Sequence, residues 1–160
     1  MSAQLIVASS LSDWAEAHIK AIFQATKQEA FDEAFEAFFA KHTEITVNGK
    51  KISRAQYKEQ IGNEKGQEVS ATVHFPGVVE VPASSNNSTA DGIVAVFTNA
   101  TVYLKEVDGR PNARIVTASH TLVVVDDPSV PHPPHTHGGP DRRRVSKADI
   151  VLVQKSAIFN

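Results

Sequence analysis

Residues 35–61 read FEAFFAKHTEITVNGKKISRAQYKEQI, and this stretch predicts the end of one helix, a short hairpin and a further helix. Asn48-Gly49 favours a type I′ turn, because both central residues of that turn need positive φ angles. Ser53 and Gln56 have the spacing of a capping box, so a helix is expected to begin directly after Ser53. Helix, hairpin and helix therefore follow one another without a linker.

The helix that leads into this stretch carries an apolar stripe at helical spacing, with acidic residues opposite. The members of the stripe are Phe31, Ala34, Phe35, Phe38 and Phe39. We interpret the stripe as core packing against a sheet, because aromatic side chains bury large areas. The alternative is an aromatic box around a ligand. Its candidate contacts are Phe35 and Trp14, the latter in an earlier helix expected to start near Leu11.

After residue 66 the sequence changes to β-branched residues in alternation, which is typical of strands. Asp108-Gly109 predicts a tight hairpin, and Pro76-Gly77 should bend the strand that contains it. Long strands are expected at residues 69–81, 93–105, 113–125 and 145–156. Helices followed by a meander of strands indicate an α+β domain, with the helices on one face of a strongly curved, mostly antiparallel sheet.

These strands differ from those of a sheet with one solvated face. In residues 93–103 and 115–125, both alternate positions carry apolar or small side chains. One face of the sheet is expected to contact the helices. The other is expected to contact a second copy of the chain, because monomers seldom expose a large apolar face. The sequence therefore predicts a homodimer through the outer face of the sheet.

Composition limits the partners and the location. The 160 residues suit one domain, residues 1–160, with a His-, Pro- and Gly-rich loop at 126–144. Sixteen basic against eighteen acidic residues give a net charge of −2, which argues against nucleic acid and membranes as partners. The chain has no cysteine, its N-terminus is unlike a secretory signal, and no apolar run approaches the ~20 residues that span a bilayer. We therefore expect a cytoplasmic protein.

The order of elements resembles that of the nuclear-transport-factor-like superfamily, which includes SnoaL-like polyketide cyclases, ketosteroid isomerases and scytalone dehydratases. The segments that carry the resemblance are AFEAFFAKH, EITVNGKKI and SRAQYKEQI, followed by the long strands. The resemblance implies a cone-shaped half-barrel with a pocket between the helices and the concave face of the sheet. It also implies several possible functions, because the superfamily contains dehydratases, isomerases, cyclases and non-catalytic members.

The best local match is VHFPG at residues 73–77, which is similar to the His-Phe segment of dehydratase-like members. The resemblance implies that His74 lines the pocket as a candidate catalytic residue. Dehydratases have a second pocket histidine where this chain has Thr98 and Asn99, and an acid where it has ATK at residues 25–27. No complete catalytic set is therefore carried over.

Three further strand residues are candidates for the site. His120 has apolar neighbours and a side chain suited to acid–base chemistry near neutral pH, although both it and His74 could instead be structural histidines. Asn99 and Tyr103 share one strand face and could hydrogen-bond a ligand. If that face is the outer one, they belong to the dimer contact instead.

The sequence PHPPHTHGGP supplies three histidines in one loop, His132, His135 and His137. Imidazoles at this spacing could bind zinc, copper or nickel. The open Pro- and Gly-rich loop offers no visible second shell, so we predict a surface loop and no physiological metal site. The adjoining run of arginines, residues 142–144, is interpreted as a solvated strand entry.

The motifs of nucleotide, zinc-protease and serine-hydrolase sites are absent from the sequence. The sequence therefore predicts a domain that binds a small apolar or aromatic metabolite without a cofactor. If the protein is an enzyme, it would be a dehydratase, isomerase or cyclase that needs only a pocket, a base and hydrogen-bond donors. The alternative is a non-catalytic homodimerisation or protein-interaction module whose cavity is filled.

Overall fold

The computed structural model describes residues 9–84, 89–131 and 141–158. Its elements, in chain order, are α1 (Leu11–Gln24), α2 (Gln28–Phe38), β1 (Phe39–Val47), β2 (Lys50–Ile52), α3 (Arg54–Gly62), a short 3-10 helix η1 (Lys65–Gln67), β3 (Glu68–Pro82), β4 (Gly92–Val107), β5 (Arg110–Asp126) and β6 (Arg143–Ile158). Among the described residues, no helix is long and apolar enough to cross a membrane.

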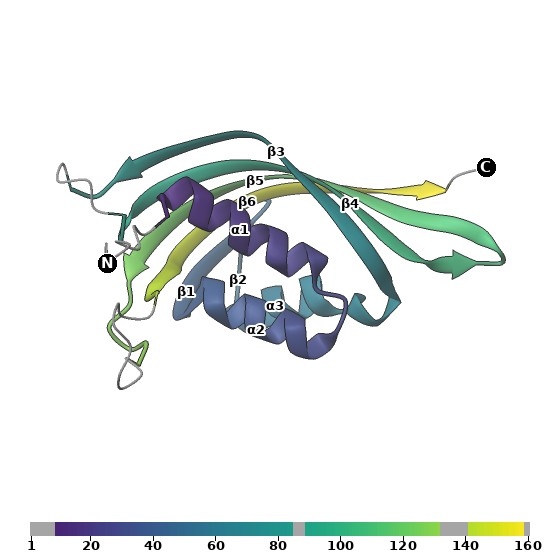
Figure 1. The fold of residues 1–160 in the computed structure, drawn as a ribbon, viewed down its shortest axis with the longest axis horizontal. Coiled ribbons are helices and arrows are strands. Elements are labelled where there is room, and N and C mark those ends of the chain that lie inside the picture. The colour runs from purple at the N-terminus through teal and green to yellow at the C-terminus, as the bar shows by residue number, and fades with distance from the viewer. Residues whose placement is uncertain (1–8, 85–88, 132–140, 159–160) are drawn as a thin grey trace, which may run out of the picture.

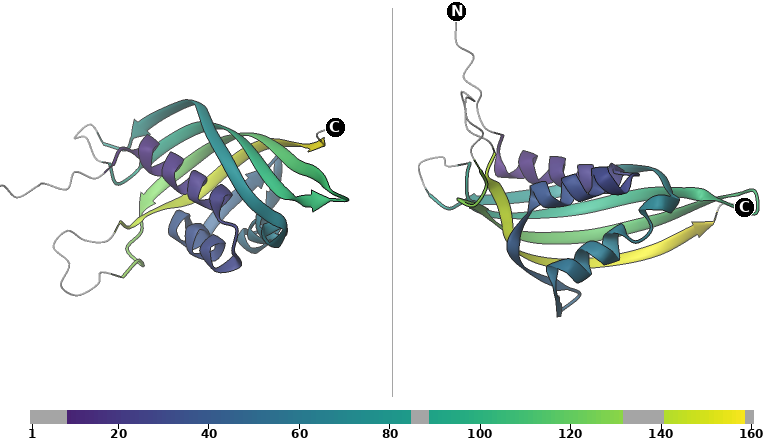
Figure 2. Two further views of the ribbon diagram at one scale, coloured as in Figure 1. Left: turned by 45° about the vertical axis from the view of Figure 1, so that its right-hand side comes forward. Right: turned by 90° about the horizontal axis from the view of Figure 1, so that it is seen from below.

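The strands of the described residues form one sheet in the order β2-β1-β6-β5-β4-β3. Only the β1–β6 pair is parallel, and the other neighbours are antiparallel. The sheet is long and curved, and the helices all lie on its concave side (Figure 1). Helix α1 packs on β3 and β4, whereas α2 and α3 lie nearer β1 at the other side of the sheet (Figure 2). The expected α+β architecture is confirmed.

The predicted turns and caps are present. Asn48 and Gly49 have φ angles of 50° and 80°, and Asp108 and Gly109 have φ angles of 52° and 72°, as type I′ hairpins require. At the start of α3 the Ser53 side chain accepts a 3.0 Å hydrogen bond from the backbone N–H three residues on, and the reciprocal bond of the capping box is also made. β1 begins directly where α2 ends, so Phe39, the last member of the phenylalanine stripe, belongs to the strand and not to the helix as expected.

A bulge in β3 changes which side of that strand faces the helices. His74 pairs with Asn99, but the next pair along is Gly77 with Phe97, so β3 has one extra residue at Pro76. Beyond the bulge, Glu80 therefore faces inward. Its carboxylate accepts hydrogen bonds from the backbone N–H of Leu11 (3.2 Å) and from the Ser12 hydroxyl (3.0 Å). A negative charge at the first turn of α1 complements the helix dipole.

The phenylalanine stripe packs into the core, as the sequence predicted. Phe31, Phe35 and Phe38 are fully buried, and neighbouring rings along the stripe lie 4.7–6.0 Å apart. Gly62, at the end of α3, faces Phe31 so closely that a methyl group at this position would lie 2.5 Å from the ring. The stripe therefore holds α2 against both the sheet and α3.

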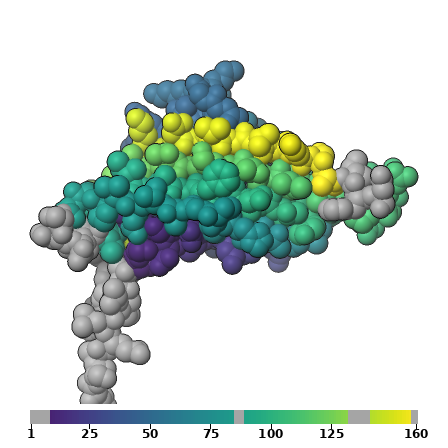
Figure 3. All heavy atoms as spheres, turned by 90° about the horizontal axis from the view of Figure 1, so that it is seen from above, coloured from purple at the N-terminus to yellow at the C-terminus, as the bar shows by residue number. Residues whose placement is uncertain are grey.

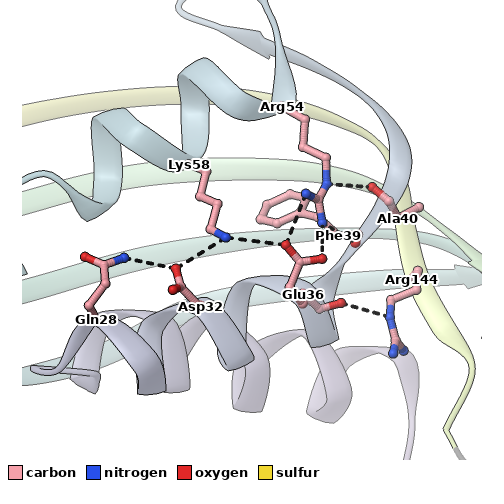
Figure 4. A network of polar contacts seen from close by, with 8 residues as sticks. All are labelled: Gln28, Asp32, Glu36, Phe39, Ala40, Arg54, Lys58 and Arg144. Atoms are coloured by element: carbon pink, nitrogen blue, oxygen red, sulfur yellow. Dashed lines mark hydrogen bonds and ion pairs between the residues drawn. The ribbon is translucent and has the colours of Figure 1, made fainter.

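A surface network links α2 to α3 (Figure 4). Arg54 donates to the Glu36 carboxylate at 2.8 Å and to the Ala40 carbonyl at 2.9 Å. Lys58 bridges Glu36 and Asp32 from the next turn of α3. The Arg54 hydrogen bond is the main cause of a lowered pKa for Glu36. Because these pairs are exposed, they orient α3 on α2 more than they stabilise the fold.

The arginine run at the start of β6 is not uniformly solvated, which corrects the sequence interpretation. Arg143 is only 6% exposed and lies over the Trp14 ring at 5.5 Å. Its guanidinium pairs with Asp141 at 2.8 Å and donates to the carbonyls of Ser9 (2.6 Å) and Thr89 (3.2 Å). The guanidinium therefore joins the segments that precede α1, β4 and β6, a role that its neighbours in sequence do not reveal.

Candidate functional site

A cavity of about 270 Å³ lies between the helices and the concave face of the sheet. The second half of α1, the α2–β1 junction and α3 form one side, and β5 and β6 form the other. Much of the wall is apolar, including Ile19, Phe38, Val116 and Leu152. The cavity therefore lies between the two layers of the fold, and its wall has an apolar part and a polar part.

His120 is the histidine that lines this cavity. Residues at even positions of β5 face inward and are buried from Val116 to Val124, so the alternation of the strand places His120 on the concave face. The side chain is 7% exposed, and Nε2 is buried without a hydrogen-bond partner among the described residues. Burial lowers the pKa of His120 to about 4. The imidazole is therefore neutral at pH 7 and offers one N–H donor and one acceptor nitrogen.

Tyr57 brings a hydroxyl to the same cavity from α3. Its ring packs edge-on against Phe39, with centroids 5.7 Å apart, and also lies against Phe35. Burial raises the pKa of Tyr57 well above its usual value, so the phenol stays protonated. The cavity wall thus includes a neutral imidazole and a neutral phenol beside apolar side chains.

A charged cluster forms one end of the cavity wall. Lys65 and Glu68 form a buried ion pair at 2.8 Å, and Lys65 Nζ also donates to the Ile22 carbonyl at 2.8 Å. Arg114, on the inward face of β5, donates to the other Glu68 oxygen at 3.1 Å and pairs with the Glu64 carboxylate. Burial lowers the pKa of Lys65, while its contact with Glu68 opposes that shift. The cluster combines two positive and two negative side chains.

The structure places three of the predicted site residues on the opposite face of the sheet. His74 and Asn99 are paired across β3 and β4, and both are exposed. Tyr103 shares the outward parity of Asn99 on β4 and is 40% exposed. None of the three is among the residues that line the cavity, so the structure does not bring them together with His120.

The two aromatic candidates are core residues. Trp14 and Phe35 are buried, and neither is among the cavity-lining residues. Trp14 packs against Phe38, with ring centroids 5.2 Å apart, and under the guanidinium of Arg143. Its Nε1 has no hydrogen-bond partner among the described residues. Trp14 therefore supports the wall behind the cavity.

Sequence reasoning missed most of the polar residues of the cavity. Tyr57 lies within the helix that the capping box predicts, but nothing in the sequence indicates that it reaches a cavity. Lys65 and Glu68 have the i, i+3 spacing of an ion pair, but nothing in the sequence indicates that they are buried. Arg114 shares strand parity with His120, so that parity was the signal that could have found it.

The residues that the structure describes contain no group of three or more His, Asp or Glu side chains placed to hold a metal ion. His132, His135 and His137 lie outside the described residues. The prediction about their loop therefore stays a prediction.

The helices over the concave face of an open mixed sheet, with a cavity between the two layers, define the nuclear-transport-factor-like cone fold of the α+β class. Comparisons with models of protein families and with curated proteins find no match to this sequence. The fold is therefore assigned from the architecture of the chain and from its similarity to solved structures.

One similar structure is a protein from Novosphingobium aromaticivorans provisionally named a scytalone dehydratase. It has a TM-score of 0.56 and 11% identity, over 91% of this chain and 85% of that one. A second is a nuclear-transport-factor-2-like protein of unknown function from Pseudomonas aeruginosa (TM-score 0.51, 13% identity, 88% and 95% coverage). A third belongs to the Mtr2–Mex67 M domain complex of C. albicans (TM-score 0.51, 13% identity, 87% and 93% coverage). At these identities the comparisons establish the fold alone.

Proposed function

We propose that this protein binds a small, largely apolar or aromatic molecule in the cavity beneath its helices, with His120 as the polar contact. The observation that carries the proposal is the cavity itself, in which one part of the wall is apolar and includes a buried, neutral imidazole. Apolar walls with a few convergent polar groups are typical of small-molecule sites. The absence of cysteine fits a reducing compartment, and we propose the cytoplasm as its location.

The volume supports a ligand built on one or two rings. An apolar cavity of roughly 150 Å³ is enough to bind benzene. A cavity of about 270 Å³ has room for a larger, substituted aromatic molecule. Ring contacts with Phe38 and Phe39 would contribute apolar burial, while His120 and Tyr57 would orient a hydroxyl or carbonyl group.

The same site would carry any cofactor-independent lyase or isomerase reaction of this protein. His120 is the candidate base, because its unprotonated ring lines the cavity. An effective general base has a pKa near the working pH, however, and the pKa of about 4 lies well below 7. The site is therefore better suited to binding than to proton transfer, and binding is the function we propose.

The test fills the cavity with a side chain and measures binding of naphthalene-based compounds by calorimetry. Ala118 is buried and lines the cavity on β5, so Ala118→Met should occupy part of the space. We expect this variant to lose at least about tenfold in affinity for 1-naphthalenemethanol. His120→Leu, which keeps the bulk but removes the nitrogens, should lose about fivefold.

The matched control is Ala17→Met, on the exposed side of α1, which should bind like the unsubstituted protein. Equal affinity in the Ala118→Met variant and its control would contradict the proposed site. A complete lack of binding to every aromatic compound tested would favour the interaction-module alternative.

We also propose that two copies of the chain associate through the outer face of the sheet. Figure 3 looks onto this convex face, on which no helix of the described residues lies across β4, β5 and β6. Its exposed apolar side chains span the strands: Val79, Val81, Ile93, Phe97, Tyr103, Ile115, Val151 and Val153. Such a patch in a soluble protein marks an interaction surface, and His74 and Asn99 then belong to this contact.

Sedimentation equilibrium tests this second proposal. Phe97 is 44% exposed near the middle of the patch, so Phe97→Lys should convert a dimer to a monomer without unfolding it. The matched control is Ala30→Lys, on the exposed side of α2, which should remain dimeric. A monomeric unsubstituted protein would contradict the proposed dimer.

A further inference from the structure

We infer that the charged end of the cavity is a subsite for a carboxylate, so that the ligand is an apolar or aromatic acid and Glu64 occupies its place in the unbound protein. This inference rests on the proposed function, because it names the class of molecule that the same cavity takes. Four side chains that line the cavity carry it: Glu64, Lys65, Glu68 and Arg114.

The buried part of the cluster has an excess of positive charge. Lys65 and Glu68 neutralise each other through a 2.8 Å ion pair whose side chains are 4% and 2% exposed. The guanidinium of Arg114 reaches the second oxygen of the same carboxylate. Two cations therefore share one buried anion, and the sum of these three groups is +1.

Glu64 supplies the balancing charge, but only from the surface. Its side chain is 55% exposed, whereas that of Arg114 is 19% exposed. An ion pair with one well-solvated partner is weak, because water and salt compete for the exposed carboxylate. Glu64 can therefore leave Arg114 at small cost, whereas Glu68 is held by both cations.

Arg114 has capacity for a further anion. Its Nη1 binds Glu64 and its Nη2 binds Glu68, while its buried Nε has no hydrogen-bond partner among the described residues. A carboxylate that replaced Glu64 could accept from Nη1, and a second polar group of the ligand could accept from Nε, which lies on the Nη2 side of the guanidinium. The side-chain amides of Gln60, Asn63 and Gln154 line the same cavity and could donate to the carboxylate oxygens.

The arrangement also explains why the ligand would be amphipathic. The apolar wall at Phe38 and Leu152 and the charged cluster belong to one cavity. A neutral aromatic molecule would leave the cluster as it is, whereas an aromatic acid would fill both parts. Displacing Glu64 costs the ligand part of its binding energy, so the removal of Glu64 should improve binding of acids selectively.

The experiment compares 1-naphthoate with 1-naphthalenemethanol, its uncharged analogue, by calorimetry on the full chain. In the Glu64→Gln variant we expect naphthoate to bind about five- to tenfold more tightly, with little change for the alcohol. In Arg114→Gln we expect naphthoate to bind at least about tenfold more weakly, again with little change for the alcohol. Glu59→Gln, an exposed carboxylate of α3 outside the cluster, makes the same change of charge and should alter neither affinity.

The outcomes separate this inference from the function on which it rests. If the alcohol binds but naphthoate does not, or if Glu64→Gln leaves the ratio of the two affinities unchanged, the carboxylate subsite is wrong and the cavity proposal stands. If neither compound binds to any variant, both proposals are wrong. If Glu59→Gln increased the affinity for naphthoate as much as Glu64→Gln does, the change in net charge alone would explain the gain. That result would also overturn the subsite.

Discussion

Lys65 and Glu68 form an ion pair at 2.8 Å that is almost completely enclosed by the protein. The ammonium also donates to the Ile22 carbonyl at the end of α1, and the carboxylate also binds Arg114 of β5. The pair therefore connects η1 and β3 to both layers of the fold. A buried pair of this kind is stable only while every member keeps its partners.

Glu68→Gln should destabilise the protein markedly. The substitution keeps the shape of the side chain but leaves Lys65 buried without an opposite charge. The expected loss in the free energy of unfolding is about 3–5 kcal/mol, measured by urea denaturation at pH 7. The control Glu59→Gln removes an exposed carboxylate and should change stability by less than about 0.5 kcal/mol. A similarly small change in both variants would show that the pair contributes little.

Stability should fall as the pH is lowered from 6.5 towards 4, because of His120. Burial depresses its folded-state pKa to about 4, below the ordinary value of 6.5, so the unfolded chain binds more protons across this range. Protonation therefore favours unfolding, by on the order of 2 kcal/mol between pH 7 and pH 5. Urea denaturation at the two pH values measures the loss.

His120→Leu isolates this contribution. The variant lacks the titrating group. Between pH 7 and pH 5 it should therefore lose less stability than the unsubstituted protein, by on the order of 2 kcal/mol. The pKa of His18 is also lowered by burial, and its contribution remains in both proteins. Identical pH profiles would mean that His120 is not the neutral buried group described above.

Gly62→Ala should destabilise the contact between α3 and α2. The added methyl would lie 2.5 Å from Phe31 Cε1, so the buried ring must move. We expect a net loss of about 1–3 kcal/mol, because overpacking outweighs the better helix propensity of alanine. The control Gly66→Ala meets no atom within 4 Å and should be close to neutral. Equal thermal unfolding temperatures for both variants would contradict the tight contact.

Arg143→Lys should weaken the end of the cone where α1 begins. Lysine keeps the positive charge but cannot reproduce the planar set of bonds to Asp141, Ser9 and Thr89. We expect a loss of about 2 kcal/mol in the free energy of unfolding, because buried partners are left without hydrogen bonds. Arg110→Lys, at an exposed position of the β4–β5 hairpin, is the control and should be neutral. Equal stability of the two variants would mean that Arg143 contributes only its positive charge and not its specific hydrogen bonds.

Local interactions explain why so much of the fold was predictable. The Asn48-Gly49 and Asp108-Gly109 turns depend on backbone conformations that few residues adopt, and they form where expected. The capping box at Ser53 is made by residues three positions apart, so the sequence alone places the start of α3. The periodicity of the phenylalanine stripe likewise determined which side of α2 is buried.

The sequence alone thus determined the elements, their order and the α+β class, because turns, caps and periodic stripes act between near neighbours. Only the tertiary structure decided which face of each strand meets the helices. His74 and His120 both have apolar neighbours, yet one is exposed on the convex face and the other lines the cavity. Strand alternation divides the side chains between two faces but does not show which face packs against the helices. That depends on the position of the helices relative to the whole sheet. The burial of Lys65, Glu68 and Arg143 was decided in the same way, because each charge is stabilised by partners from distant parts of the chain.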